Sequence, residues 1–297
     1  MRVFVTGASG FVGSAVVQEL LRAGHKVLGL ARSETSAQAI AGAGAEVYRG
    51  DVEDSDALAR AVAQVDGVIH TAFNHDFSKF AANCAADRRV IEALGAALAG
   101  SSRPLVVTSG TALLAPGQLA TEDAAVPETS PVPRVASEQA AAAVAARGVQ
   151  VSVVRLPPTV HGEGDHGFVP MVIGIAREQR VSAYVGDGMN RWPAVHRLDA
   201  ATLFCLALEK GAAAERYHAV DDEGVPFRDI AAVIGRHLSV PVVSKSPAEA
   251  AGHFGWFAHF AAIDNPASSR HTRELLGWQP RQAKLIADLD GPRYFGP

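Results

Sequence analysis

Two hydrophobic patterns alternate along the first half of the chain. Short apolar runs, such as residues 2–6, are each followed by a segment in which apolar residues recur every three or four positions. The first pattern is typical of buried β-strands and the second of amphipathic helices. Together they predict strands at 2–6, 26–30, 46–49, 67–70, 104–108 and 149–155, and helices at 12–23, 36–43, 55–63, within 77–98 and at 134–147.

Strand–helix–strand alternation favours a parallel sheet with helices on both faces. Right-handed crossovers then make the doubly wound arrangement the default. We therefore predict an α/β fold, a doubly wound parallel Rossmann sheet with a smaller C-terminal substrate domain that begins near Pro157-Pro158. The Rossmann domain should comprise residues 1–156 plus about 196–220, with a return strand near 216–219, and the small domain about 157–195 plus 221–297. The proline-rich stretch 116–133 is expected to be a loop.

The composition of the chain limits which kinds of partner it is expected to bind. The 297 residues are 48% hydrophobic and 20% charged, with a net charge of −4 and no block of like charge, which argues against nucleic acid. No uncharged apolar run approaches the roughly 18 residues that span a membrane. Two cysteines indicate neither a disulfide framework nor a metal site, and we expect a cytoplasmic location. The expected partner is a small-molecule substrate, with a homodimer possible through the alanine-rich stretch 140–146.

The sharpest motif is the glycine-rich segment 6–13, which lies between the first strand and the first helix. Gly7 permits a tight turn, Gly10 lets the backbone approach a pyrophosphate, and Gly13 allows the helix to pack closely on the strand. Free N–H groups at the helix start then face the phosphates. A turn without a ligand fits this position less well. The predicted dinucleotide contacts here are Gly7, Ser9, Gly10, Phe11, Val12 and Gly13.

The second strand indicates which dinucleotide binds. It ends without the carboxylate that would bind the ribose of NAD, and instead carries Arg32 and Ser33, which suit a 2′-phosphate. We therefore predict NADP(H), the alternative being that Arg32 is an ordinary solvated residue. After the third strand, Asp51 is expected to accept from the adenine amino group while Val52 packs on the ring. Asp51 as a helix-start residue is an equal alternative from spacing alone.

Four further segments complete a family resemblance: residues 50–52, 155–162, 185–188 and 196–200, in this order after the TGxxGxxG motif. The chain resembles the extended short-chain dehydrogenase/reductases over nearly its whole length. That family includes sugar epimerases and dehydratases, 3β-hydroxysteroid dehydrogenases and carbonyl reductases. The resemblance implies that Thr71, Ala72, Phe73 and Thr108 join the cofactor site, with Leu156 and Pro157 near the nicotinamide.

The chain departs from this family at its chemistry. The family uses a tyrosine and a lysine four residues later, but none of the four tyrosines here is followed by lysine at that spacing. Arg134 stands at the tyrosine position and Glu138 at the lysine position. An arginine holds its proton too firmly to deliver it near neutrality, although it can stabilise an oxyanion. Glu138 can accept from ribose hydroxyls. An ordinary pair at a helix start is the alternative.

Other catalytic candidates follow from the same resemblance. The family's catalytic hydroxyl falls near Gly110, so that Ser109 or Thr111 would have to substitute for it. Asn83 matches the family's helix asparagine. His161 replaces a tyrosine in the family's Val-Tyr-Gly motif and is the leading proton donor, with a hydrogen-bonded structural histidine as the alternative.

Two clusters of residues could have either a structural or a functional role. The histidines and acids of residues 161–166 lie within one loop, and we predict no metal site there. Phe254, Trp256, Phe257 and Phe260 either wall an apolar substrate pocket or form the core of the small domain.

We therefore expect an NADP(H)-dependent oxidoreductase that reduces a carbonyl, quinone or imine-like group. The alternative is a non-catalytic NADP(H)-binding or redox-sensing protein, which the missing tyrosine–lysine pair favours. An epimerase or dehydratase fits less well, because those reactions need a tyrosine-like base and no basic cluster suits a substrate diphosphate.

Overall fold

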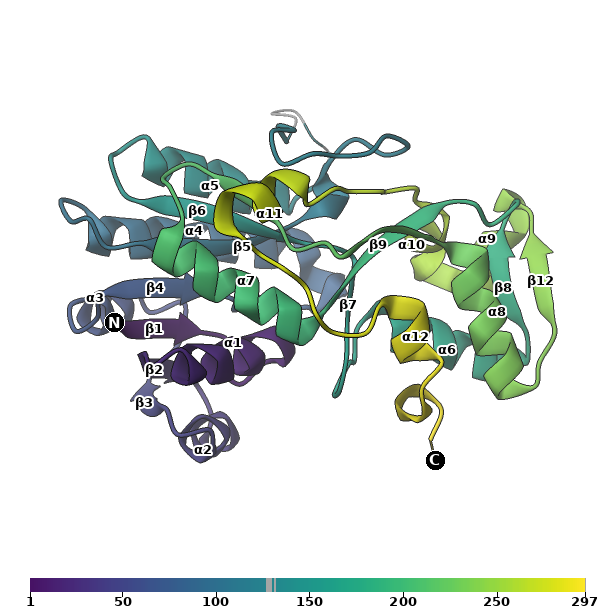
Figure 1. Ribbon diagram of the computed structural model, residues 1–297, viewed down its shortest axis with the longest axis horizontal. Coiled ribbons are helices and arrows are strands. Elements are labelled where there is room, and N and C mark those ends of the chain that lie inside the picture. The colour runs from purple at the N-terminus through teal and green to yellow at the C-terminus, as the bar shows by residue number, and fades with distance from the viewer. Residues whose placement is uncertain (127–129, 131, 297) are drawn as a thin grey trace.

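The computed structural model describes residues 1–126, 130 and 132–296. Its main feature is a seven-stranded sheet in the order β10-β6-β5-β4-β1-β2-β3, in which every neighbouring pair is parallel. The strands are β1 (Arg2–Thr6), β2 (Lys26–Ala31), β3 (Glu46–Arg49), β4 (Gly67–His70), β5 (Leu105–Gly110), β6 (Val151–Leu156) and β10 (Arg216–His218). The molecule therefore has an α/β fold with a Rossmann-like sheet, as predicted (Figure 1).

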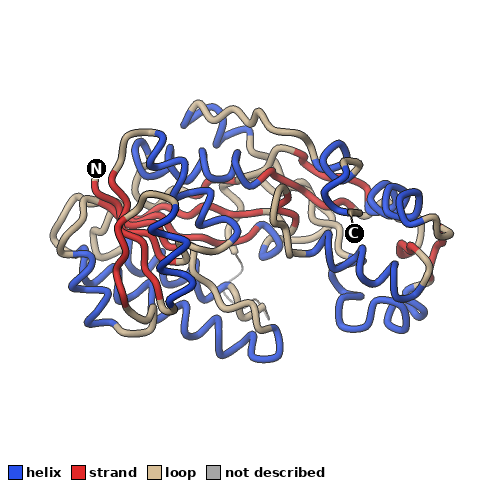
Figure 2. Tube along the Cα trace, turned by 90° about the horizontal axis from the view of Figure 1, so that it is seen from below, coloured by secondary structure: helices blue, strands red, loops and turns tan. Residues whose placement is uncertain are grey.

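Helices cover both faces of this sheet, and Figure 2 shows its twisted strands between them. One face packs against α1 (Phe11–Arg22), α2 (Glu34–Gly42), α7 (Arg197–Lys210) and α11 (Arg270–Leu276). The other packs against α3 (Ser55–Val62), α4 (Phe80–Leu98) and α5 (Val135–Ala145). Two apolar cores result, one on each side of the sheet.

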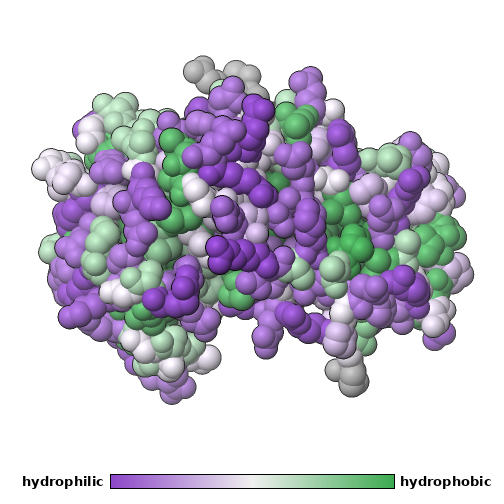
Figure 3. Space-filling view, in the orientation of Figure 1, coloured by the Kyte–Doolittle hydropathy of each residue, from purple (hydrophilic) through white to green (hydrophobic). Residues whose placement is uncertain are grey.

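A smaller group of elements lies beside the sheet, on the right in Figure 1. It has a three-stranded sheet of β7 (Thr159–His161), β9 (Arg191–His196) and β11 (Asp222–Pro226), and a two-stranded sheet of β8 (Ser182–Val185) and β12 (Val242–Lys245). Its helices are α6 (Phe168–Gln179), α8 (Phe227–Leu238), α9 (Pro247–Phe254), α10 (Ala258–Ala262) and α12 (Leu285–Leu289). Their apolar side chains form a third core around Trp192, Phe227 and Phe257. The face in Figure 3 is mainly hydrophilic, and its larger hydrophobic groups lie over this smaller part.

The predicted elements are all present, with shifts at their ends. Arg134 precedes α5 as its N-cap residue, and β5 continues two residues beyond the predicted end to Gly110. Within the predicted loop 116–133 the described residues are irregular apart from an isolated bridge at Ala120, and 127–129 and 131 lie outside the described residues. One predicted boundary is wrong for part of the C-terminal segment: Leu276 and Trp278 join the core of the large sheet. No described helix is long and apolar enough to cross a membrane.

The strand order places the site. After β1 the chain builds β2 and β3 on one side, and then returns to build β4, β5 and β6 on the other. In open α/β sheets, ligands bind outside the carboxyl ends of the strands at this switch point. The loops that follow β1 and β4 are therefore expected to form the ligand cleft.

Helices α4 and α5 cross closely at Gly95, where an added Cβ would lie 2.3 Å from a methyl carbon of Val144. Overpacking of this kind costs about 1–3 kcal/mol, against a helix-propensity gain of about 1 kcal/mol for alanine over glycine. Gly95→Ala should therefore lower the free energy of unfolding in urea, and Val144→Ala should partly relieve the change in the double variant. Gly174→Ala on α6, where nothing lies within 4 Å, is the control and should not destabilise. Additive effects at 95 and 144 would contradict this packing.

Candidate active site

The loop after β1 fits a dinucleotide pyrophosphate. Gly7 has φ +70°, and a Cβ there would lie 2.7 Å from the backbone nitrogen of Ala72; a Cβ on Gly13 would lie 2.0 Å from the Gly7 carbonyl oxygen. Helix α1 begins at N-cap Gly10 without a side-chain cap, whereas Ser33 and Asp54 cap α2 and α3. The N–H groups of the first turn are thus left to a bound anion, as phosphate binding at a helix start requires.

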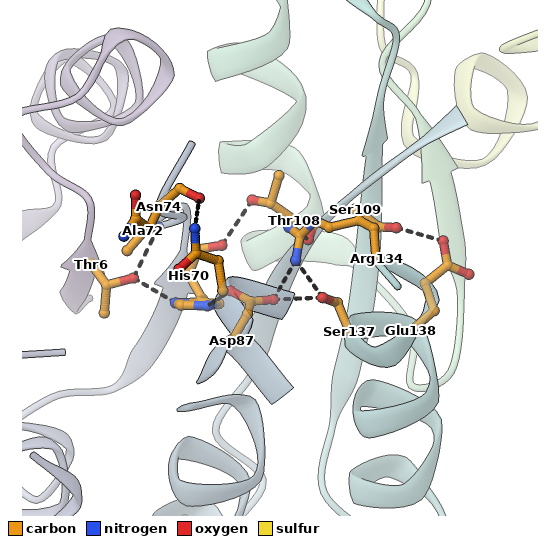
Figure 4. Close-up of polar contacts among 11 residues, drawn as sticks. Thr6, His70, Ala72, Asn74, Asp87, Thr108, Ser109, Arg134, Ser137 and Glu138 are labelled. Atoms are coloured by element: carbon orange, nitrogen blue, oxygen red, sulfur yellow. Dashed lines mark hydrogen bonds and ion pairs between the residues drawn. The ribbon is translucent and has the colours of Figure 1, made fainter. Parts of the chain in front are cut away.

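A hydrogen-bonded chain connects the ends of β1 and β4 to helix α4 (Figure 4). The hydroxyl of Thr6 lies 2.7 Å from His70 Nδ1, and His70 Nε2 lies 3.0 Å from a carboxylate oxygen of Asp87. The Ala72 N–H donates to the Thr6 hydroxyl. With the His70 proton on Nε2, the imidazole donates to Asp87 and accepts from Thr6, so each group in the chain has a suitable partner.

Asp87 also holds Arg134 at the start of α5. The second carboxylate oxygen of Asp87 accepts hydrogen bonds from Arg134 Nη1 and from the Ser137 hydroxyl. The Ser137 hydroxyl oxygen also accepts a hydrogen bond from Arg134 Nη1. Arg134 Nη2 donates to the Thr108 carbonyl at 3.2 Å. Burial alone raises the pKa of Asp87, but the hydrogen bond from His70 and the attraction of His70 and Arg134 outweigh it and hold that pKa well below its usual range. Asp87 is therefore a carboxylate throughout the neutral range.

Arg134 is not fully engaged by its partners among the described residues. Its guanidinium carbon lies 4.0 Å from the ring centroid of Phe73, in a cation–π contact. The described residues accept three of the five guanidinium N–H groups, and the side chain is 14% exposed. The two remaining N–H groups are available to an oxyanion.

Two predicted site residues, Glu138 on α5 and Ser109 on β5, have partners inside the protein instead of facing the cofactor or substrate. Glu138 does not face a ribose: its carboxylate receives Nε and Nη2 of Arg155 at 2.8 and 2.7 Å. The Ser109 hydroxyl donates to the same carboxylate at 2.7 Å and is buried. Since Arg155 is fully buried, Glu138 serves to neutralise it, and Ser109 completes that pair rather than a catalytic site.

Three more candidates are also engaged elsewhere. Thr111 is fully buried and donates to the Asn265 side chain. His161 is 1% exposed, and its Nδ1 lies 2.8 Å from Asp288, so the prediction that it supplies a proton is not supported. Asn83 donates to the carbonyls of residues 74 and 76, and therefore shapes the loop after β4 instead of contacting a reacting group.

The remaining predicted contacts lie along the carboxyl ends of the sheet. Arg32 follows β2, is exposed, and has no hydrogen-bond or ion-pair partner in the described part of the chain, whereas Ser33 is engaged as the cap of α2. Asp51 is exposed and accepts from the N–H of Glu53, while Val52 packs against the core. The other positions are half-buried or buried at the ends of β4, β5 and β6: Thr71, Ala72, Phe73, Thr108, Leu156 and Pro157.

Sequence reasoning missed His70, Asp87 and Ser137. One signal was present for Asp87: it lies on the buried face of α4 together with Cys84, Val90 and other apolar residues, where an isolated acid needs partners. Which residues supply those partners depends on the crossing of α4 and α5, and no local pattern reveals it.

The late aromatic residues are divided between the core of the smaller part and its surface. Phe254 and Phe257 are buried in the third core, but Trp256 is 56% exposed. The ring of Trp256 lies 5.2 Å from that of Phe77 in the 3-10 turn η1 (Phe77–Lys79), which follows the loop after β4. Aromatic rings thus continue from the Arg134–Phe73 contact to the smaller part of the molecule.

Comparison with known proteins gives consistent results. The model of the NAD dependent epimerase/dehydratase family matches residues 3–221. An uncharacterized protein of Schizosaccharomyces pombe is 53% identical over 296 residues, covering 99% of this chain and 100% of that protein. The 2-alkyl-3-oxoalkanoate reductase of Stenotrophomonas maltophilia is 30% identical over 263 residues, covering 83% of this chain and 78% of the reductase. The structure of DesIV, a dTDP-glucose 4,6-dehydratase from Streptomyces venezuelae, has a TM-score of 0.78 at 21% identity, covering 98% of this chain and 95% of that one, which shows a common fold.

The Asp87 network should make stability depend on pH. Asp87→Asn replaces a carboxylate by an amide, whose N–H groups would face the three donors His70, Arg134 and Ser137. Breaking a buried ion pair in this way lowers the free energy of unfolding by about 3 kcal/mol or more. Because the folded-state pKa of Asp87 is depressed, its stabilisation is present above the ordinary value of 3.8 and is lost as the pH falls further. The difference in unfolding free energy between wild type and variant should therefore be largest near neutrality and shrink below about pH 4.

Urea unfolding from pH 7 to pH 3 measures this difference. Glu92→Gln removes an exposed carboxylate on the same helix and should have little effect at any pH. A pH-independent cost of Asp87→Asn would contradict the assigned ionisation.

Proposed function

The chain belongs to the NAD-dependent epimerase/dehydratase family, the extended short-chain dehydrogenase/reductases, and we propose that it is an NADP(H)-dependent oxidoreductase that reduces a carbonyl, quinone or imine-like group of a small molecule. The observation that carries this proposal is Arg134, which Asp87 holds at the family's tyrosine position and which has two N–H groups without an acceptor among the described residues. A fixed cation beside the cleft suits a reaction in which negative charge develops on oxygen.

The proposed reaction is a hydride transfer to carbon followed by a proton transfer to oxygen. When bound, NADPH supplies a hydride to the carbonyl carbon and is oxidised to NADP⁺, while the π-bond electron pair moves to the carbonyl oxygen. Arg134 stabilises that oxygen by charge-assisted hydrogen bonds, and Phe73 packs against the guanidinium and limits its movement. The oxygen then takes one proton from another group, because arginine keeps its own.

A relative supports the reductive direction. The protein from Stenotrophomonas maltophilia that is 30% identical to this chain is named a 2-alkyl-3-oxoalkanoate reductase, and that name describes reduction of a ketone. The proposed substrate class extends this chemistry to the present chain. The aromatic side chains that continue from Phe73 to Trp256 suit a substrate with an apolar body.

One observation favours a second function. Glu138 occupies the family's lysine position and is bound to Arg155, so it supplies no positive charge to a ribose or to a general acid. A chain that keeps the glycine loop without that lysine is also suited to non-catalytic NADP(H) binding or redox sensing. This second function differs from the oxidoreductase in one measurable outcome, which is tight cofactor binding without turnover.

Preference for NADPH over NADH is expected from Arg32, whose guanidinium is exposed and unpaired among the described residues. A charge-assisted hydrogen bond to the 2′-phosphate is worth about a factor of ten in affinity. Calorimetric titration should show tighter binding of NADPH than of NADH, and Arg32→Ala should weaken NADPH about tenfold without affecting NADH. Arg22→Ala is the control, because Arg22 lies at the C-terminal end of α1, away from the glycine loop at the start of that helix. Equal loss of both nucleotides in Arg32→Ala would contradict the phosphate contact.

Arg134→Ala should reduce kcat about a hundredfold, the usual cost of one oxyanion donor, with little change in NADPH affinity. NADPH oxidation with 4-nitrobenzaldehyde, cyclohexanone and 1,4-naphthoquinone as probes measures this effect. Thermal melting should first confirm that the variant is folded, since it leaves Asp87 with fewer donors. Arg88→Ala removes an exposed arginine of α4 and should keep full activity. Full activity in Arg134→Ala would exclude its assigned role, and tight NADPH binding without turnover in wild type would favour the second function.

A further inference from the structure

Reduction of a carbonyl needs a proton donor, and the structure removes the expected ones. Thr111 and His161 are buried and bonded to Asn265 and Asp288, and Ser109 donates to Glu138. The donor must therefore be another titratable group on the cleft side of Arg134.

His75 has the required position. It lies in the loop after β4, between residues 74 and 76, whose carbonyls both accept from the Asn83 side chain. Its ring meets that of Phe73 edge-on, with centroids 5.1 Å apart, and the guanidinium of Arg134 lies over the same Phe73 ring at 4.0 Å. Imidazole and guanidinium thus share one aromatic neighbour, and the imidazole side chain is exposed.

A second exposed histidine, His166, is placed differently. The ring of His166 lies 5.5 Å from that of Phe11, the first residue of α1, and its Nδ1 approaches the Gly164 carbonyl at 3.1 Å. His166 therefore adjoins the helix start that suits phosphate, whereas His75 adjoins Arg134.

We propose that His75 is the catalytic residue that exchanges a proton with the reacting oxygen, an inference that rests on the proposed function. As the carbonyl is reduced, the imidazolium N–H bond breaks and an O–H bond forms on the substrate oxygen. The neutral imidazole then takes a proton from solvent. In the reverse direction the neutral imidazole accepts the hydroxyl proton of the alcohol.

The surroundings of His75 set the direction of its pH response. Partial desolvation in the cleft, followed by the charges of Arg134 and His166, lowers its pKa below the ordinary 6.5, while a hydrogen bond to the Phe73 carbonyl and the charge of Asp87 oppose this to a lesser degree. At pH 7 the imidazole is mainly neutral. The rate of reduction should therefore rise as the pH falls toward the His75 pKa and decline as the pH rises above it.

Kinetics with the full-length protein test the proposal through its pH profile. His75→Gln keeps a polar side chain of similar reach but cannot titrate, so kcat for NADPH-dependent reduction of the probe carbonyls should fall about a hundredfold or more and lose its acidic rise. NADPH affinity should be unchanged. His271→Gln, an exposed histidine on α11, is the matched control and should behave like wild type. An unaltered kcat and pH profile in His75→Gln overturns the proposal, as does loss of the acidic rise in His166→Gln instead.

A titration that needs no turnover separates this proposal from the proposed function. The His75 resonances, identified by their loss in His75→Gln, are followed by NMR against pH with NADPH or NADP⁺ bound. The oxidised nicotinamide carries a positive charge, so a histidine close to the reacting centre should have a pKa about one unit lower with NADP⁺. If wild type turns over none of the probes, the proposed function loses its support, and this shift still supports the position of His75. Equal pKa values with the two nucleotides overturn the proposal whatever the kinetics show.

Discussion

The arrangement of side chains at the carboxyl ends of β1, β4 and β5 depends on one buried carboxylate. Asp87 is 5% exposed, and a charge in that environment is tolerated only when hydrogen-bond donors surround it. Its donors are His70 at the end of β4 and Ser137 and Arg134 at the start of α5. Satisfying this charge therefore fixes the end of the sheet relative to two helices. It also holds Arg134 at the carboxyl edge of the sheet, where ligands bind in open α/β folds.

A second buried charge, that of Arg155, explains why a glutamate stands at the family's lysine position. Arg155 is fully buried on β6 and requires an acid, which Glu138 supplies from the neighbouring helix. A lysine at 138 would bring a second positive charge to Arg155, and burial makes like charges especially costly. The glutamate is therefore coupled to the arginine, and a single substitution to lysine at position 138 would leave Arg155 without its carboxylate partner. The altered catalytic pair is thus part of the packing of the sheet as well as of the cleft.

Local features were predictable from the sequence, and features that depend on tertiary contact were not. The strands of the large sheet and the turn at Gly7 follow from apolar runs and glycine spacing, because backbone conformation and burial leave a local trace. His161 was assigned to catalysis by its position in a family motif. Its partner Asp288 lies 127 residues away, and only the folded chain brings it to the imidazole. The sequence singled out Arg134 as a site candidate but not its partner Asp87, since their contact depends on how two helices cross.

Arg134 keeps its charge across the neutral pH range, and this distinguishes it from the tyrosine that the family has at this position. A tyrosine can gain or lose the reacting proton, whereas arginine stays charged and Asp87, with its lowered pKa, stays ionised over the same range. In the proposed reaction the pair would therefore stabilise a developing oxyanion equally well across neutral pH and would contribute no proton. The proposed reaction thus divides between separate groups the two tasks that one tyrosine performs. A fold common to a dehydratase at 21% identity does not reveal such a division, because the function depends on the side chains that the fold presents.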